Sequence, residues 1–211
     1  MPDTMHRLRT ETRDLHDSAE RQDFQQRMVR GALTREEYAA WLGQMLLIHR
    51  ALETPLAARL AADARFAAVT PEQLQVPRLL ADLEALGVAA AGIRPLPATE
   101  ELTTRVAVEA QADPLRLLGY HYVLEGSNNG NRFISRALLP ALGLERDRGG
   151  LYLDPYGADQ PAVWRRFKDE MGRVAFSAAE VDTLVDAARE MFAAIGAVSE
   201  GLAANHHAAA V

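Results

Sequence analysis

The sequence predicts an all-α protein that folds as one domain of residues 1–211. Helix-favouring residues such as Ala, Leu, Arg and Glu are abundant, whereas aromatic residues make up only 6% of the chain. No stretch alternates apolar and polar residues as a half-buried strand does. The length of 211 residues fits a single domain. We therefore expect seven or eight packed helices, followed by a frayed tail over 203–211.

Capping residues and spaced apolar positions mark the helices of the first half. Residues 5–20 carry apolar side chains three and four positions apart, which predicts one helix. Thr34 and Glu37 form a capping box that opens a second helix, which Pro55 ends or kinks. Thr70-Pro71 begins a third helix that reaches about Gly87, and 88–98 is expected to be a loop.

The second half contains two longer predicted helices. Asp113-Pro114 begins a long apolar helix that runs to about Gly143. Residues 144–160 contain Gly, Pro and charged residues and are expected to form a loop. A second capping box, Ser177 with Glu180, opens a final helix that ends near Leu202.

The long helix has an unusual centre, the sequence GSNNG at 126–130. Two glycines and three helix-neutral residues cost a helix roughly a few kcal/mol, about 1 for each glycine. Helices kink at such Gly/Ser positions, and glycine lets the backbone approach a flat ligand closely. The alternative is a real break, with two helices joined by a polar turn.

Composition excludes several classes of function. The chain has 23 Lys and Arg against 29 Asp and Glu, a net charge of −6, which disfavours binding to nucleic acid. It has no cysteine, which excludes disulfides, Cys-ligated zinc and Cys-ligated iron–sulfur clusters. No apolar run is long enough for a membrane span, and the polar start does not resemble a secretion signal, so we expect a cytoplasmic protein.

Three histidines are candidate metal ligands. His16 lies four residues before Glu20 on the first predicted helix, where a carboxylate can orient a metal-bound imidazole. The alternative is a surface histidine paired with a glutamate. His49 lies on the apolar stripe of the second helix, where a hydrogen-bonded core histidine is the commoner explanation. His121 precedes the glycine segment and could face the same pocket.

Three segments resemble the heme oxygenase family. LRTETRDLHDSAE (8–20) with GALTREEYAAWLGQMLLIHRALE (31–53) is similar to the first two helices of that family. GYHYVLEGSNNGNRF (119–133) looks like its kinked distal helix, and residues 167–192 are similar to its last two helices. The resemblance implies a single-domain helical bundle with a kinked distal helix, and it spans about residues 8–200.

The resemblance also implies roles for individual residues. His16 is the proximal ligand of the heme iron, and Glu20 holds its second ring nitrogen. Gly126 and Gly130 let the backbone lie on the heme face. Ser127 occupies a position near a distal water, and His49 falls where relatives often carry a Tyr of the same water network.

Basic and amide residues complete the implied site. Arg9 and Lys168 match residues that meet the heme propionates, and the nearby alternatives are Arg13, Arg165 and Arg166. Asn128 adds a neutral side chain beside Ser127. Asn129 and Asn131 depart from the family pattern of apolar and small residues, and their amides could bond a distal water or crowd the pocket.

The implied reaction is the opening of heme by O₂ to biliverdin, Fe²⁺ and CO. The electrons come from an external ferredoxin or NADPH-dependent reductase, because the chain has no flavin or iron–sulfur motif. Two alternatives stay open: a heme-binding or heme-sensing protein without catalysis, and a different enzyme on the same scaffold, such as a cofactor-free oxidase or a thiaminase-like hydrolase.

Overall fold

The computed structural model describes the backbone of residues 4–209 and the side chains of 4–204. Within these residues there are nine α-helices, four short 3₁₀ helices and no strand, which confirms the all-α class. The α-helices are α1 (Thr4–Glu11), α2 (Arg13–Glu20), α3 (Asp23–Val29), α4 (Arg35–Arg59), α5 (Val76–Ala85), α6 (Pro97–Ala112), α7 (Arg116–Ala141), α8 (Gln160–Arg173) and α9 (Ala178–Ala209). The 3₁₀ helices are η1 (Ala64–Phe66), η2 (Pro71–Gln73), η3 (Ala90–Gly92) and η4 (Gly157–Asp159).

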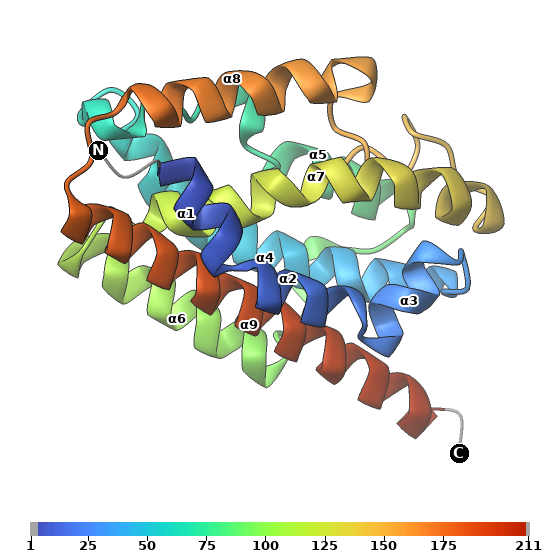
Figure 1. The fold of residues 1–211 in the computed structure, drawn as a ribbon. Coiled ribbons are helices and arrows are strands. Elements are labelled where there is room, and N and C mark those ends of the chain that lie inside the picture. The colour runs from blue at the N-terminus through green and yellow to red at the C-terminus, as the bar shows by residue number, and fades with distance from the viewer. Residues whose placement is uncertain (1–3, 210–211) are drawn as a thin grey trace.

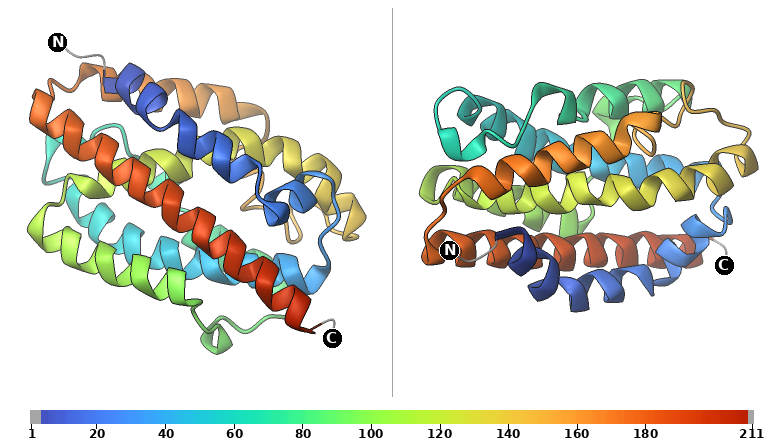
Figure 2. Two further views of the ribbon diagram at one scale, coloured as in Figure 1. Left: turned by 60° about the horizontal axis from the view of Figure 1, so that its bottom comes forward. Right: turned by 45° about the horizontal axis from the view of Figure 1, so that its top comes forward.

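Helix α9 is the long helix around which the others are arranged. It packs along α7 and also contacts α6, α4 and the three N-terminal helices (Figures 1 and 2). The close contact with α7 depends on Gly119, since a Cβ atom there would lie 2.5 Å from the carbonyl oxygen of Leu184. The buried apolar side chains form one connected core between these helices. This packing supports α7 along one side.

The N-terminal segment is divided more finely than the sequence predicted. The single helix expected over 5–20 is two helices that meet at Thr12, and the unpredicted α3 follows them. The hydroxyl of Thr12 donates a hydrogen bond to the carbonyl oxygen of Leu8 at 2.6 Å. Such bonds from a threonine to the preceding turn compete with regular helix geometry. The segment therefore wraps over α9 in three short pieces (Figure 1).

The capping boxes are confirmed, but two predicted boundaries are wrong. Thr34 and Glu37 exchange hydrogen bonds of 3.2 and 2.8 Å at the start of α4. Pro55 does not end this helix, which continues to Arg59 with buried Leu52 and Leu56 on both sides of the proline, and a kink at Pro55 stays a prediction. Thr70-Pro71 opens the 3₁₀ helix η2 instead of α5.

Helix α7 passes through the GSNNG segment without a break. The alternative of two helices joined by a turn is therefore wrong, and a bend within the unbroken helix stays a prediction. The polar side chains bond inside the helix, where Ser127 donates to the Leu124 carbonyl oxygen at 2.7 Å and Asn129 donates to that of Gly126 at 2.9 Å. Neither Gly126 nor Gly130 has a positive φ angle.

The C-terminal helix is longer than expected. Ser177 and Glu180 cap its start, and its backbone continues past Leu202 to Ala209. Most of the tail expected over 203–211 falls outside the residues whose side chains the structure describes, so its fraying stays a prediction. Among the described helices, none is both long and apolar enough to cross a membrane.

Candidate functional site

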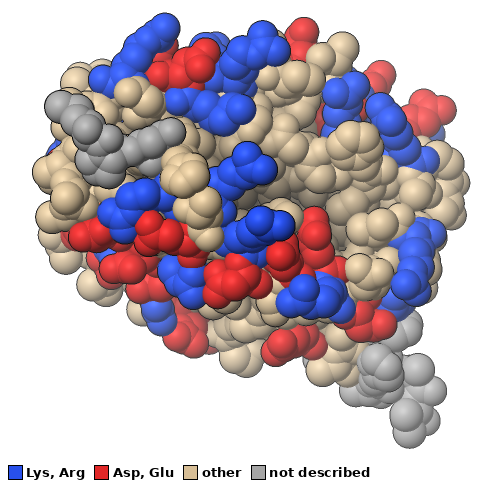
Figure 3. Space-filling view, in the orientation of Figure 1, with Lys and Arg blue, Asp and Glu red and all other residues tan. Residues whose placement is uncertain are grey.

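A cleft separates the N-terminal helices from α7. Thr12 lies beside the hydroxyl of Tyr122 at one end, and Gly31 lies against the backbone of Ala137 at the other. Between these two contacts, α2 packs mainly on α9. Figure 3 shows a hollow in the middle of this face, bordered by Lys and Arg side chains. The cleft thus lies beside the segment of α7 that contains the two glycines.

The wall that α7 gives to the cleft is bare backbone at Gly130. Apart from its chain neighbours and its own helix backbone, a Cβ atom built on Gly130 meets no described atom within 4 Å. Ser127 is exposed on the same side of the helix, and its hydroxyl is bonded back to the preceding turn. Gly126 lies one turn earlier, where the nearest atom to a built Cβ belongs to the ring of Trp164, at 3.4 Å. The face is therefore neutral and without side-chain cover at Gly130.

His16 presents its imidazole to solvent on α2. Its side chain is 54% exposed, and its Nε2 atom lies 3.8 Å from Oε1 of Glu20. Its Nδ1 atom lies 3.7 Å from Oδ1 of Asp17. Both distances exceed a hydrogen bond, so the two carboxylates flank the ring without occupying either nitrogen. The three side chains could place one ligand atom each within 4.8 Å of one another, an arrangement able to hold a metal ion.

The predicted basic residues differ in how strongly they are held. Arg9 and Lys168 are exposed on α1 and α8, two helices that pack against each other. The side chain of Arg13 is 80% exposed, with only a 3.9 Å contact to Asp17. Arg166, in contrast, donates hydrogen bonds to Thr70 and Glu72. Arg9, Arg13 and Lys168 are therefore better placed than Arg166 to meet an anionic ligand.

His49 lies in the interior and not on the cleft surface. Its side chain is 5% exposed, with Nδ1 2.8 Å from Oε1 of Glu53. Its Nε2 atom lies 3.0 Å from the hydroxyl of Tyr152. Both ring nitrogens are thus engaged, as the core-histidine alternative predicted. His121 is also buried, and burial lowers its pKa to about 3, so it stays neutral.

The asparagines after Gly126 turn away from the bare face. Asn128 is 2% exposed and donates to Oε2 of Glu125 at 3.2 Å, and Asn131 is also buried. Asn129 bonds within the helix and accepts a hydrogen bond from Gln160 at 3.4 Å. At about 100° per residue, positions 128 and 129 lie on other sides of α7 than Gly130. The amides of Asn128 and Asn129 therefore do not crowd the cleft.

Sequence reasoning missed the buried carboxyl of Glu125. It accepts a hydrogen bond from the hydroxyl of Tyr156 at 2.9 Å, on the side of α7 that faces away from the cleft. Burial raises its pKa to about 7, although the bonds from Tyr156 and Asn128 oppose the shift. A charged residue in the apolar run before Gly126 was the available signal.

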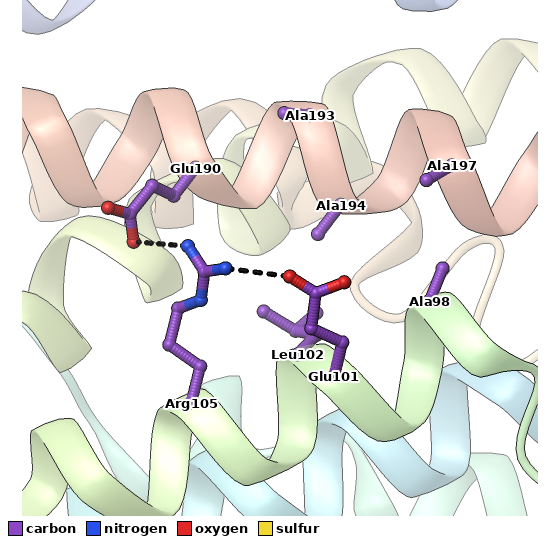
Figure 4. A pocket seen from close by; sticks show the side chains of 8 residues that line it. All are labelled: Ala98, Glu101, Leu102, Arg105, Glu190, Ala193, Ala194 and Ala197. Atoms are coloured by element: carbon purple, nitrogen blue, oxygen red, sulfur yellow. Dashed lines mark hydrogen bonds and ion pairs between the residues drawn. The ribbon is translucent and has the colours of Figure 1, made fainter.

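A second hollow lies between α6 and α9 (Figure 4). It has small side chains and an ion-paired edge, in which Arg105 contacts Glu101 at 2.8 Å and Glu190 at 3.5 Å. None of the residues singled out in the sequence lines it. The candidate site is therefore the cleft between α2 and α7.

Comparisons with known proteins identify the fold and the family. The model of the family described as "Heme oxygenase" matches residues 3–200. Heme oxygenase-1 of the cyanobacterium Synechocystis sp. PCC 6803, solved in complex with heme, is 21% identical with a TM-score of 0.89, and the alignment covers 98% of this chain and 95% of that one.

Two further solved structures are similar over nearly the whole chain. Heme oxygenase-2 of the same cyanobacterium, in complex with heme and NO, is 21% identical with a TM-score of 0.90, covering 98% of this chain and 88% of that one. The heme oxygenase of Leptospira interrogans is 20% identical with a TM-score of 0.84, covering 94% and 98%. No curated protein matches the sequence. From the family match over residues 3–200, the chain belongs to the heme oxygenase family.

Proposed function

We propose that the protein is an active heme oxygenase that binds heme as its substrate in the cleft between α2 and α7. The products are biliverdin, Fe²⁺ and CO, formed with O₂ and with electrons from an external ferredoxin or NADPH-dependent reductase. One combination carries the proposal: an exposed imidazole on α2 whose ring nitrogens have no hydrogen-bond partner, and bare backbone at Gly130 on α7.

The packing of the protein does not explain Gly130. A glycine inside a helix costs about 1 kcal/mol relative to alanine. At Gly119 the close approach of α9 requires that cost, but at Gly130 no described atom lies within 4 Å of a built Cβ. A flat ligand lying on the helix gives a reason for the missing side chain. The cleft residues therefore fit heme.

Each cleft residue then has a defined part. His16 would bind the heme iron, with Glu20 beside the ring to orient it. Arg9, Arg13 and Lys168 would bind the two propionates, and Arg165 is a further candidate. Ser127 keeps the surface near Gly126 and Gly130 neutral.

Bound heme supplies the iron at which O₂ is reduced. The protein's contribution is to hold the ring against α7 and to keep charged side chains away from that face. We propose that His49, Asn128 and Asn131 act from behind α7, by fixing the interior on which this helix rests. The cytoplasm is the compartment proposed for the reaction.

The test begins with purified protein and one equivalent of hemin. A sharp Soret band is expected on mixing, and it should decay under air with ascorbate or a ferredoxin system while red bilin absorbance grows. A Soret band that persists under reduction would contradict the oxygenase activity and leave a heme-binding or heme-sensing protein. The absence of any Soret change would show that the protein does not bind heme.

A further inference from the structure

An aromatic stack closes one end of the cleft. Trp164 of α8 lies parallel to Phe167, with an angle of 8° between the rings and 5.4 Å between their centroids. Phe167 is fully buried and contacts His121 at 5.8 Å. Tyr122 of α7 contacts the indole at 5.9 Å. Trp164 is therefore supported from behind by core residues while part of its own surface stays exposed.

The indole covers one of the two glycines and leaves the other bare. Three atoms of its six-membered ring, Cη2, Cζ2 and Cζ3, lie 3.4–3.9 Å from a Cβ built on Gly126. Nothing described lies within 4 Å of the same position on Gly130. The two glycines are one helical turn apart, about 6 Å along α7. The bare face is thus open toward Phe133 and closed toward Tyr122.

A flat macrocycle that covers both Gly130 and Gly126 meets this closed end. Trp164 cannot retreat into the core, because Phe167 fills the space behind it. Lys168 lies one turn further along α8, on the same side of the helix as Trp164. The indole and this ammonium group therefore present a flat apolar surface and an anion-binding group side by side.

We propose that Trp164 is a specificity-determining residue that fixes the in-plane rotation of the tetrapyrrole and so selects the bridging carbon that is opened. The inference rests on the proposed function, because it concerns how the same substrate sits in the same cleft. The apolar indole beside the Lys168 ammonium distinguishes the apolar part of the ring edge from the part that carries the carboxylates. Lys168 and Arg9 then hold the carboxylates in the orientation that the wall permits.

The test compares the wild type with Trp164→Ala and Trp164→Phe. The first readout requires no turnover: it counts the sets of heme methyl resonances in the proton NMR spectrum of the cyanide-bound ferric complex, one set for each seating of the ring. The second readout is the ratio of biliverdin isomers after reaction. Asp169→Ala, an exposed position on the same helix, is the matched control.

The wild type, Asp169→Ala and Trp164→Phe should each show one dominant set of resonances. Trp164→Ala should show a second set, and the ratio of seatings should change about fivefold, as expected for the loss of one aromatic contact. The isomer ratio should change in the same direction. A single unchanged set in Trp164→Ala would overturn the inference, even if the reaction itself proceeds.

The two proposals fail in different ways. If the wild type binds heme but does not open it, the resonances still decide whether Trp164 sets the seating of the ring, while the selection of the opened carbon falls with the oxygenase activity. If the wild type binds no heme, both proposals fail together.

Discussion

The chain contains two His–Glu pairs with the same four-residue spacing and opposite surroundings. The side chains of His16 and Glu20 on α2 are 54% and 69% exposed, and the His16 Nε2 atom lies 3.8 Å from Oε1 of Glu20. Those of His49 and Glu53 on α4 are 5% and 8% exposed, and the His49 Nδ1 atom lies 2.8 Å from Oε1 of Glu53. Glu53 also accepts hydrogen bonds from the backbone of Gln75 and Val76. The ring nitrogens of His16 are available to a ligand, whereas those of His49 are already engaged by Glu53 and Tyr152.

The difference comes from what covers each helix. α4 is packed against α5 and α6, and Tyr152 from the loop before α8 closes over His49. α2 packs on α9, and the cleft lies between it and α7. A histidine becomes a candidate ligand when at least one ring nitrogen has no protein partner, and the spacing to a carboxylate does not decide this. Substitutions in the two pairs should therefore affect different properties.

The largest effect is expected from His16→Ala. Losing the proposed iron ligand should lower the rate of heme opening at least ~100-fold, because even residues behind a metal ligand change activity by 10–100-fold. The Soret band should shift, and added imidazole should restore part of its position. The stability of the heme-free protein should change by less than about 0.5 kcal/mol, since the site is exposed.

Ser18→Ala, an exposed position on the same helix, is the control for His16→Ala. An unchanged Soret spectrum in His16→Ala would show that another residue binds the iron.

His49→Ala should lower the stability of the fold and leave the heme-bound spectrum unchanged. Removing the imidazole leaves the Glu53 carboxylate and the Tyr152 hydroxyl buried without this partner, so we expect a loss of about 2–3 kcal/mol in the free energy of unfolding. Urea denaturation of the heme-free protein measures it. The heme-bound spectrum of the folded fraction should match the wild type. A loss of iron ligation with unchanged stability would contradict the contrast between the two pairs.

The buried carboxyl of Glu125 should make the stability of the fold depend on pH. Its folded pKa of about 7 lies above the ordinary 4.5, so the folded state holds a proton that the unfolded chain releases. The carboxyl therefore favours folding below about pH 4.5, and this contribution is lost as the pH rises toward 7. Relative to Glu125→Gln, the wild type should lose up to ~3 kcal/mol of stability between pH 5 and 8.

Urea unfolding at several pH values checks the prediction for Glu125. Burial also raises the pKa of Asp82, to about 6, but its contribution to the pH dependence of stability is the same in the wild type and in Glu125→Gln. Parallel pH profiles for the two proteins would show that Glu125 is ionised in the folded state.

The smallest main effect among these predictions is expected at Gly130. Gly130→Ala should stabilise the heme-free protein by up to about 1 kcal/mol, because it improves helix propensity without a clash. The same methyl group should weaken hemin binding, measured by Soret titration. Gly119→Ala is the contrast, since its Cβ would meet the Leu184 carbonyl oxygen at 2.5 Å and should destabilise the fold. Unchanged hemin affinity in Gly130→Ala would argue against heme on this face.

The sequence predicted the all-α class and several of the helix starts. The capping boxes at Thr34 and Ser177 are formed by local hydrogen bonds between residues three apart, so their signals survive folding unchanged. The division of the N-terminal helix was not predicted, because the break at Thr12 depends on the hydrogen bond from the Thr12 hydroxyl to the carbonyl oxygen of Leu8. The persistence of α4 past Pro55 depends on burial of the neighbouring leucines.

For the candidate site, the sequence by itself determined which side chains are available, including a histidine with a carboxylate at the right spacing and glycines inside an apolar helix. Only the tertiary structure decided which of them meet. It exposed His16 and buried His49, left Gly130 bare, and placed Trp164 over Gly126. The physical reason is that periodicity shows which residues share a face of a helix, whereas the partner that covers that face comes from residues far away in the chain.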